Sequence, residues 1–465
     1  MRKYRLLRRK NVSDLLKKSG TVQLQQTLGA LDLVLLGVGA IVGTGIFILP
    51  GTVAATHSGP AIVFSFIIAA IVCGLAGLCY SEFSSSIPVT GSAYTYGYIV
   101  FGEIVAWLVA WALVLEYGLA AASVATGWSS YLSAFLEGFH IYMPKAFTGP
   151  FNPANGTYIN VPAIAIVLAI TFLLTHGIKE SAKFNRIMVF IKVGVILLFI
   201  GVGIFYVEPA NWDPFMPFGI SGVMSGAALV FFAYLGFDAV SSAAEEVKNP
   251  QRNLPIGIIG SLLICTVLYL IVSLVLTGIV SYKQLNVSDP VSFAIQLIHQ
   301  DWIAGIISLG AVVGMMTVIL VMIYGGTRLL YALGRDGLLP KNMCELHEEY
   351  KSPVKSTWIF GILIAFCGGV IPLSKLAELV NIGTLLAFTV VSIGVIFLRK
   401  NKSIPEGGFK VPFFPVLPIC SFLLCLFLIS QLSIHTWIAS SIWFIFGLLI
   451  YVAYGRHHSV MNKKE

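Results

Sequence analysis

Two ionisable side chains lie inside apolar stretches of this sequence, and they are the first candidates for chemistry. Lys192 lies in RIMVFIKVGVILLF and Glu116 lies in AWALVLEYGLAAA. A charge within a bilayer is costly, so such residues pair with one another or with backbone carbonyls and mark ion or proton pathways. A plainer interpretation stays open for each: Lys192 extends its ammonium group to the membrane surface, and Glu116 is a protonated or paired residue of the packing.

Backbone groups are the second candidate. The stretch 31–57 reads LDLVLLGVGAIVGTGIFILPGTVAATH and has glycines at positions 37, 39, 43 and 45. Each glycine costs a helix interior about 0.5–1 kcal/mol, so the helix unwinds most readily here. Unwound backbone inside a membrane must face protein, a cavity or a ligand. The sequence therefore predicts a binding site at residues 41–46; the alternative is that the glycines only allow close helix packing.

A similar interruption recurs at residues 229–255, which read LVFFAYLGFDAVSSAAEEVKNPQRNLP. An aromatic, apolar helix reaches Gly236 and Asp238, and it is expected to resume over 238–247 with Asp238 as its N-cap. Paired discontinuous helices in a membrane protein indicate a substrate site near the middle of the bilayer.

The elements that position these residues are membrane spans. The chain has 465 residues, 57% of them hydrophobic and 11% charged, and its mean hydropathy is +0.89. This composition excludes an ordinary soluble protein. The seven cysteines form no CxxC motif and lie mostly in apolar runs, so neither a disulfide framework nor a metal site is predicted.

A span needs about 20 apolar residues. We therefore expect an all-α polytopic membrane protein with twelve transmembrane helices, near 31–56, 60–82, 100–126, 160–176, 186–207, 218–245, 255–280, 302–334, 356–372, 376–398, 412–430 and 436–454. Of the 29 lysines and arginines, 25 lie on the side of the N-terminus under this topology. The positive-inside rule then places both termini in the cytoplasm.

The first and sixth of ten spans are the interrupted ones, which suggests two five-helix repeats. The repeats must be inverted relative to each other, because an odd number of spans starts the second repeat from the opposite face. We expect a cytoplasmic arm (1–30), the two repeats (31–207 and 208–398), two additional helices (399–454) and a cytoplasmic tail (455–465).

Three stretches carry a resemblance to a known family. GVGAIVGTGIF in span one, FFAYLGFDAVSSAAEEVKNPQRNLP in span six and TRLLYALGRDGLLP at the end of span eight resemble the amino acid–polyamine–organocation superfamily. Within it, the sequence is most similar to the bacterial form of the cationic amino acid transporter branch. The resemblance covers essentially the whole chain. It implies the LeuT-type fold, with alternating access and with proton rather than sodium coupling.

The resemblance also implies a substrate site. The break of span one would supply residues 41–45, with the N–H groups of Thr44 and Gly45, next to Gly43, binding the substrate carboxylate. The ammonium group would lie on carbonyls of Ile41, Phe232, Ala233 and Leu235. Half-helix N-termini attract anions and C-terminal carbonyls attract cations, so the assignment is physically consistent.

Four side chains take specific roles by the same resemblance. Phe232 would be an aromatic gate over the substrate, and Met322 in span eight would border the substrate side chain. Lys192 would face the broken part of span one and, with Glu116, take part in proton coupling. Asp238 would either cap its half-helix or take part in hydrogen bonding or proton movement. For Phe232 and Met322, ordinary packing stays open as the alternative.

The sequence thus predicts a secondary transporter of the cell membrane that imports L-amino acids with protons. Met322 fills space and carries no charge, which favours small neutral substrates such as alanine. The alternatives are cationic amino acids, amino acid exchange, a channel, or a sensor without transport. No cofactor, metal ion or nucleic acid is expected. A homo-oligomer or a small single-helix partner subunit is left open.

Overall fold

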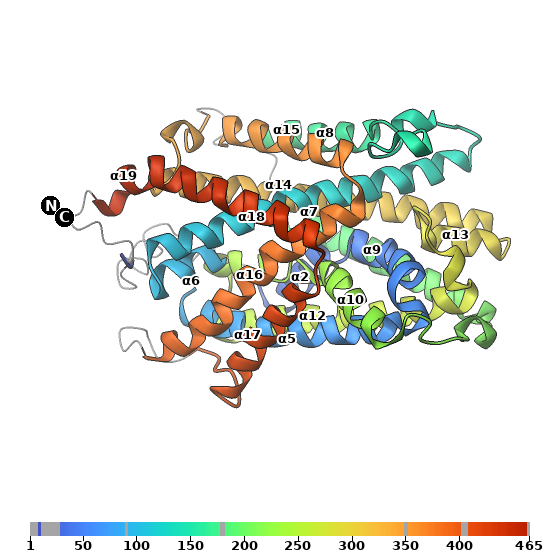
Figure 1. The fold of residues 1–465 in the computed structure, drawn as a ribbon, viewed down its shortest axis with the longest axis horizontal. Coiled ribbons are helices and arrows are strands. Elements are labelled where there is room, and N and C mark those ends of the chain that lie inside the picture. Colours follow the sequence, from blue (N-terminus) through green and yellow to red (C-terminus); the bar gives the residue numbers. More distant parts are fainter. Residues whose placement is uncertain are drawn as a thin grey trace.

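The computed structural model describes residues 8–10, 28–88, 92–176, 182–347, 352–400 and 408–462. These residues form helices and connecting turns, with isolated β-bridges but no strand in the ranges just given. The long helices run roughly along one direction and form a bundle (Figure 1). The prediction of an all-α protein is confirmed.

The first half of the bundle begins with an interrupted helix. Its pieces are α2 (Ala30–Ile41), α3 (Thr44–Phe47) and α4 (Leu49–Val53), followed by a π-helical turn at Ala54–Ser58. The remaining helices of this half are α5 (Ile62–Ser86), α6 (Ser92–Val100), α7 (Glu103–Glu137), α8 (Val161–Thr175) and α9 (Ala182–Gly203).

The second half repeats the pattern. An interrupted helix consists of α10 (Gly219–Val230), a 3₁₀ turn at Phe231–Tyr234, and α11 (Ala239–Ser242). It is followed by α12 (Pro250–Ile279), α13 (Pro290–Leu297), α14 (Asp301–Arg335), α15 (Val354–Val370) and α16 (Leu373–Lys400). The chain ends in α17 (Val416–Ser430), α18 (Ile434–Ile450) and the short α19 (Arg456–His458).

Helix length and composition identify a multi-pass membrane protein. In the described part of the chain, eight helical stretches are long and apolar enough to cross a membrane. Shorter apolar helices occupy other predicted spans, namely α2, α8, α15 and α17. Every predicted span therefore coincides with helix. The number of twelve crossings and the inverted relation of the repeats stay predictions.

Two elements differ from the sequence-based expectation. The helix α6, with the sequence SAYTYGYIV, lies in a stretch that was expected to be a loop, and all nine of its residues are buried. Its tyrosines and threonine lower the hydropathy of the stretch, so the sequence does not indicate a buried helix. Packing against α7 and α16 nevertheless buries them. The helix α7 also runs to Glu137, beyond its expected end at 126.

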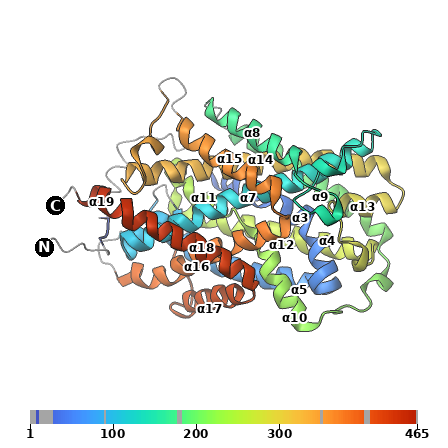
Figure 2. The same cartoon turned by 45° about the horizontal axis from the view of Figure 1, so that its top comes forward.

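The two longest helices, α7 and α14, each have 35 residues and pack against each other in the bundle. The helix α16 packs on α7, and α12 packs on α5 and α2. The pair α8 and α15 lies at one edge of the bundle (Figures 1 and 2). This arrangement surrounds both interrupted helices with protein, as unwound backbone in a membrane requires.

The last helices attach through tryptophan side chains. Trp111 donates its indole N–H to the carbonyl of Trp443 at 2.9 Å, and Trp443 donates back to the carbonyl of Trp111 at 3.0 Å. Trp107 donates to the carbonyl of Gly447 at 2.9 Å. These bonds fix α18 on α7. Most of the α18 side chains that do not face α7 are not buried within the described part of the protein.

Segments from both ends of the chain meet at one end of the bundle. The Lys10 Nζ atom lies 2.6 Å from Asp336 Oδ2, just after α14, and the N–H of Val460 donates to the Asp336 carbonyl at 3.0 Å. Ser459 donates its hydroxyl to Glu103 Oε2 at 2.6 Å. The arm before the first helix and the tail after the last therefore lie on the same side.

Candidate functional site

The first interruption is confined to two residues between α2 and α3. Val42 has an extended backbone (φ −74°, ψ 99°), and Gly43 has φ −148° and ψ −140°. Residues 44–47 then form a new helical turn, so the N–H groups of Thr44 and Gly45 belong to its start, where a helix leaves its N–H groups without internal partners. The predicted break within 41–46 is confirmed.

The second interruption is longer and is built differently. The helix α10 tightens into the 3₁₀ turn of residues 231–234, Leu235 becomes extended (φ −64°, ψ 147°), and Gly236 has φ +104°. Only glycine adopts that φ without strain. The chain resumes as α11, which ends at Ser242 and continues as a 3₁₀ turn at Ala244–Glu246, so the single helix expected over 238–247 is replaced by two short turns.

The two interruptions lie directly against each other. A Cβ atom on Gly45 would lie 2.5 Å from the Cα of Ala233, and one on Gly236 would lie 3.0 Å from the carbonyl oxygen of Ala40. Both distances are too short for a larger residue without displacement of the backbone. The structure therefore brings together Ile41, Gly43, Thr44 and Gly45 with Ala233, and places the flanking Phe232 and Leu235 in the same segment.

Tyr269 of α12 joins the two interruptions. Its hydroxyl lies 2.6 Å from the carbonyl oxygen of Ala233 and 3.2 Å from that of Ile41. The residue is fully buried. These are two of the carbonyls that the sequence assigned to the substrate ammonium group, so a tyrosine hydroxyl is part of the same polar cluster. The sequence analysis missed this residue.

Lys192 of α9 is fully buried, and its Nζ donates a hydrogen bond of 2.7 Å to the carbonyl oxygen of Gly39 in α2. Gly314 of α14 makes room for the lysine stem, because a Cβ there would lie 2.8 Å from Lys192 Cγ. The ammonium group thus points at the inner half of the first interrupted helix. The alternative in which it extends to the membrane surface is wrong for this conformation.

A second polar cluster lies beside the second interruption. Tyr117 of α7 donates its hydroxyl to Asp238 Oδ2 at 3.2 Å. Glu116 is 1% exposed, neither of its carboxylate oxygens has a hydrogen-bond partner within the described part of the chain, and it is close enough to Asp238 for electrostatic interaction. Asp238 occupies the N-cap position of α11, but its side chain forms no capping hydrogen bond. The capping prediction is therefore wrong: Asp238 has a helical backbone (φ −67°, ψ −23°), whereas a capping residue takes an extended one, and its Oδ2 atom accepts the bond from Tyr117.

The helix α14 borders the first interruption through residues that the sequence analysis did not name. The Thr44 hydroxyl lies 3.7 Å from the sulfur of Met315, and a Cβ on Gly43 would lie 3.3 Å from a Val318 methyl group. Met322 is buried and lies seven residues after Met315, on the same helix face. It is one to two turns further along α14 from the residues that contact the break.

Phe232, the expected gate, is 6% exposed and lies in the 3₁₀ turn. Its carbonyl oxygen already accepts a bond of 3.3 Å from the N–H of Leu235. Its ring is packed within the protein here, so the gate role stays a prediction.

Comparison of the sequence with known proteins identifies the family of this chain. The sequence profile described as Amino acid permease matches residues 28–453. A methylthioribose transporter of Bacillus subtilis is 52% identical over 458 residues, which cover 98% of this chain and 99% of the relative. The chain belongs to the amino acid permease family. It is a member of the amino acid–polyamine–organocation superfamily, as the three motifs predicted.

Other relatives of this permease differ in the substrates that their names state. The branched-chain amino acid permease BcaP of Bacillus subtilis is 50% identical over 462 residues, with 98% of this chain and 99% of the relative covered. A vacuolar cationic amino acid transporter 4 of Arabidopsis thaliana is 33% identical, with 98% and 96% covered. The permease is thus a transporter, and family membership by itself leaves the substrate side chain open.

Proposed function

We propose that this permease imports small neutral L-amino acids, such as alanine, together with protons by alternating access. The observation that carries the proposal is the buried Lys192 ammonium group on the Gly39 carbonyl, one turn before the break of the first helix. A charged lysine holds the inner half of that helix against α9. Loss of its proton weakens this bond, so the protonation state becomes linked to the position of α2.

The proposed substrate site uses the facing backbone of the two interruptions. The carboxylate lies on the N–H groups of Thr44 and Gly45, and the ammonium group lies on the carbonyls that Tyr269 now contacts, with those of Phe232 and Leu235 nearby. This arrangement recognises any α-amino acid, because it uses only the zwitterion. Tyr269 adds a hydroxyl whose bonds to Ala233 and Ile41 must be shared or exchanged when the substrate enters.

Selection among side chains is assigned to α14. Met315, Val318 and Met322 present thioether and methyl groups on one helix face. These groups favour apolar side chains and offer no charge to a guanidinium or ammonium group. Alanine is the first candidate. Branched-chain amino acids are the second, since the same apolar face fits them and a relative of 50% identity carries that name.

Uptake by purified protein in sealed liposomes tests the proposal. Labelled alanine should accumulate when the outside is more acidic than the inside, and sodium should have no effect. Accumulation without a pH gradient but with amino acid loaded inside would identify an exchanger, and strict sodium dependence would contradict proton coupling. Passive flux of small ions would identify a channel, and binding without any flux would identify a sensor.

Competition against labelled alanine tests the substrate class. The unlabelled competitors are leucine, valine, arginine, lysine and methylthioribose, and each is tested on the parent and on Met322→Ser. In the variant, the arginine concentration that halves alanine uptake should fall about tenfold or more, the equivalent of about 1.4 kcal/mol of affinity. The reason is that the loss of the thioether opens volume while the backbone site is unchanged. Strong arginine competition in the parent that the substitution leaves unchanged would restore cationic amino acids as the leading class.

A further inference from the structure

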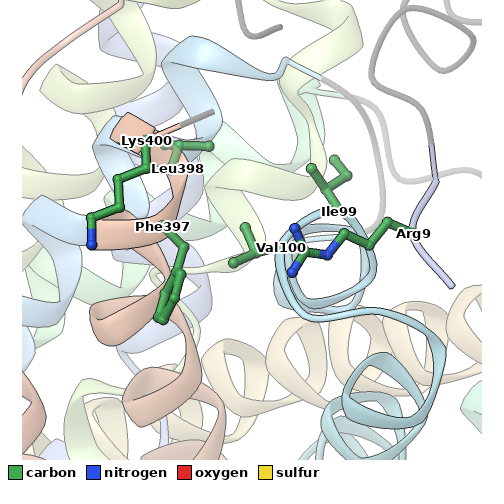
Figure 3. A pocket seen from close by; sticks show the side chains of 6 residues that line it. All are labelled: Arg9, Ile99, Val100, Phe397, Leu398 and Lys400. Carbon is green, nitrogen blue, oxygen red and sulfur yellow. The ribbon is translucent and has the colours of Figure 1, made fainter. Parts of the chain in front are cut away.

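The described part of the chain contains a basic cavity that the transport site does not use. It has a volume of about 290 Å³ and lies between α6, α16 and the N-terminal arm. Its lining residues are Arg9, Ile99, Val100, Phe397, Leu398 and Lys400. Figure 3 shows Phe397 and Lys400 projecting from α16 on one side and Arg9 above the end of α6 on the other, with Val100 between them.

The two cations of this cavity have no carboxylate partner among the described residues, although their neighbours in sequence do. Lys10 lies 2.6 Å from Asp336, and Arg399 lies 2.7 Å from Glu82. The ion pairs in the described ranges do not include Arg9 or Lys400, and both side chains are exposed. Within the described ranges, the positive charge at this cavity is therefore not neutralised by a carboxylate.

The cavity lies where α16 leaves its apolar stretch. The last turns of the helix are apolar from Gly394 to Leu398, and the helix ends in Arg399 and Lys400. Phe397 is 45% exposed, one turn before Lys400. An apolar helix segment that ends in arginine and lysine is typical of the boundary between hydrocarbon and headgroups. By the distribution of lysine and arginine, this boundary is the cytoplasmic one.

We propose that this cavity binds the headgroup of an anionic phospholipid of the cytoplasmic leaflet. The phosphate lies between Arg9 and Lys400, and the glycerol and the first acyl carbons lie on Phe397 and Val100. Basic pockets between transmembrane helices on the cytoplasmic side favour such headgroups, because the leaflet is itself negatively charged.

The apolar lining favours a lipid over a soluble phosphate compound. Four of the six lining residues are apolar, and one of them is the exposed Phe397. A free phosphate or a nucleotide would leave this surface in contact with water, whereas the upper part of an acyl chain would cover it. Arg9 is also the residue before Lys10, which forms an ion pair with Asp336 after α14.

Lipid retention measured by native mass spectrometry of the purified full-length protein tests the proposal. The protein is exchanged into neutral detergent and titrated with phosphatidylglycerol or with phosphatidylcholine of the same chains. The parent should retain phosphatidylglycerol preferentially. Arg9→Gln and Lys400→Gln should each lower its apparent affinity about fivefold, from about 1 kcal/mol of attraction per basic residue, and Lys400→Arg should keep it.

The control variant is Lys341→Gln, which removes an exposed lysine elsewhere on the same side. It should leave retention unchanged. An equal preference for both lipids, or equal losses in Lys341→Gln and Lys400→Gln, would overturn the proposal. Displacement of the bound lipid by millimolar glycerol 3-phosphate would assign the site to soluble phosphates instead. Size-exclusion profiles that match the parent establish that each variant is folded, and the readout does not depend on transport.

Discussion

The two interrupted helices are held in different ways. The inner half of the first is bonded by an ionisable group, Lys192 on the Gly39 carbonyl, and its outer half by the Tyr131 hydroxyl on the Phe47 carbonyl at 2.8 Å. The second is bonded by neutral donors: Asn381 donates to the Ala228 carbonyl at 2.7 Å, and Tyr117 donates to Asp238.

Under the proposed proton coupling, this difference predicts which helix responds to protons. A bond from a lysine depends on the charge of its donor, whereas the donors on the second helix, the Asn381 amide and the Tyr117 phenol, stay neutral over the physiological pH range. We therefore expect the inner half of the first helix to be the moving element and the second interrupted helix to be the fixed wall. Tyr269 contacts both interrupted helices, because its hydroxyl lies near the Ile41 carbonyl of the first and the Ala233 carbonyl of the second.

The largest expected effect comes from Lys192→Ala. Alanine binding should persist, because the proposed zwitterion site is backbone, but accumulation driven by an inward proton gradient should fall about 100-fold or more, since proton and conformation are no longer linked. Uptake in liposomes with an imposed pH gradient measures this. Lys375→Ala, at an exposed lysine in the first turn of α16, is the matched control. If Lys192→Ala accumulates alanine as the parent does, the inner half of the first helix is not the element that responds to protons.

Tyr269→Phe removes only the hydroxyl that the two interruptions share. We expect the alanine concentration for half-maximal uptake to rise about tenfold, because one net hydrogen bond of about 1–1.5 kcal/mol is lost at the site, while the pH dependence is kept. Tyr234→Phe is the control, since the Tyr234 hydroxyl bonds to the Phe66 carbonyl at 3.1 Å and not to the first interruption. Equal effects of the two variants would mean that Tyr269 has no special link to the substrate.

Asn381→Ala tests whether the second interrupted helix is the fixed element. It removes the donor to the Ala228 carbonyl at the end of α10, which should lower the stability by about 1–3 kcal/mol. A thermal melt in detergent should show the loss, and the shape of the pH profile of uptake should not change. A shifted pH profile would show that the second helix also responds to protons.

The smallest effect is expected at Asp289, the acidic residue directly before α13. Burial raises the pKa of Asp289 from its ordinary value to about 7. A raised pKa in the folded state stabilises the protonated form, so this contribution to stability is present below about pH 4 and is lost as the pH rises towards 7.

Asp289→Asn should therefore melt at the same temperature as the parent near pH 4 and a few degrees higher at pH 8, with a gain of about 1–2 kcal/mol. Melting curves across this range measure it. Proton-driven uptake should be unaffected, because the hydrogen bonds of Asp289 within the described residues join it to Ser288 and Phe293 and not to residues 41–45 or 232–238. A loss of coupling in this variant would mean that ionisable groups outside the first helix drive the cycle.

The sequence by itself determined the helical class, the positions of the spans and the places where two of them break. These follow from local chemistry: apolar length predicts a span, and glycines weaken regular helix, which is interrupted at Gly43 and Gly236 although Gly37 and Gly39 stay within α2. It also identified Lys192 and Glu116, since a charge within an apolar stretch is visible without a structure. The three motifs then predicted the superfamily.

Only the tertiary structure decided which groups meet. Tyr269 lies in an apolar helix and Met315 in another, and neither spacing indicates that they contact residues 41–44, because those contacts join segments more than 200 positions apart. The helix α6 was missed for the same reason, since its tyrosines are buried only by α7 and α16. The sequence left Asp238 either a local cap or a distant partner, and the packing of α7 places the Tyr117 hydroxyl 3.2 Å from its carboxylate.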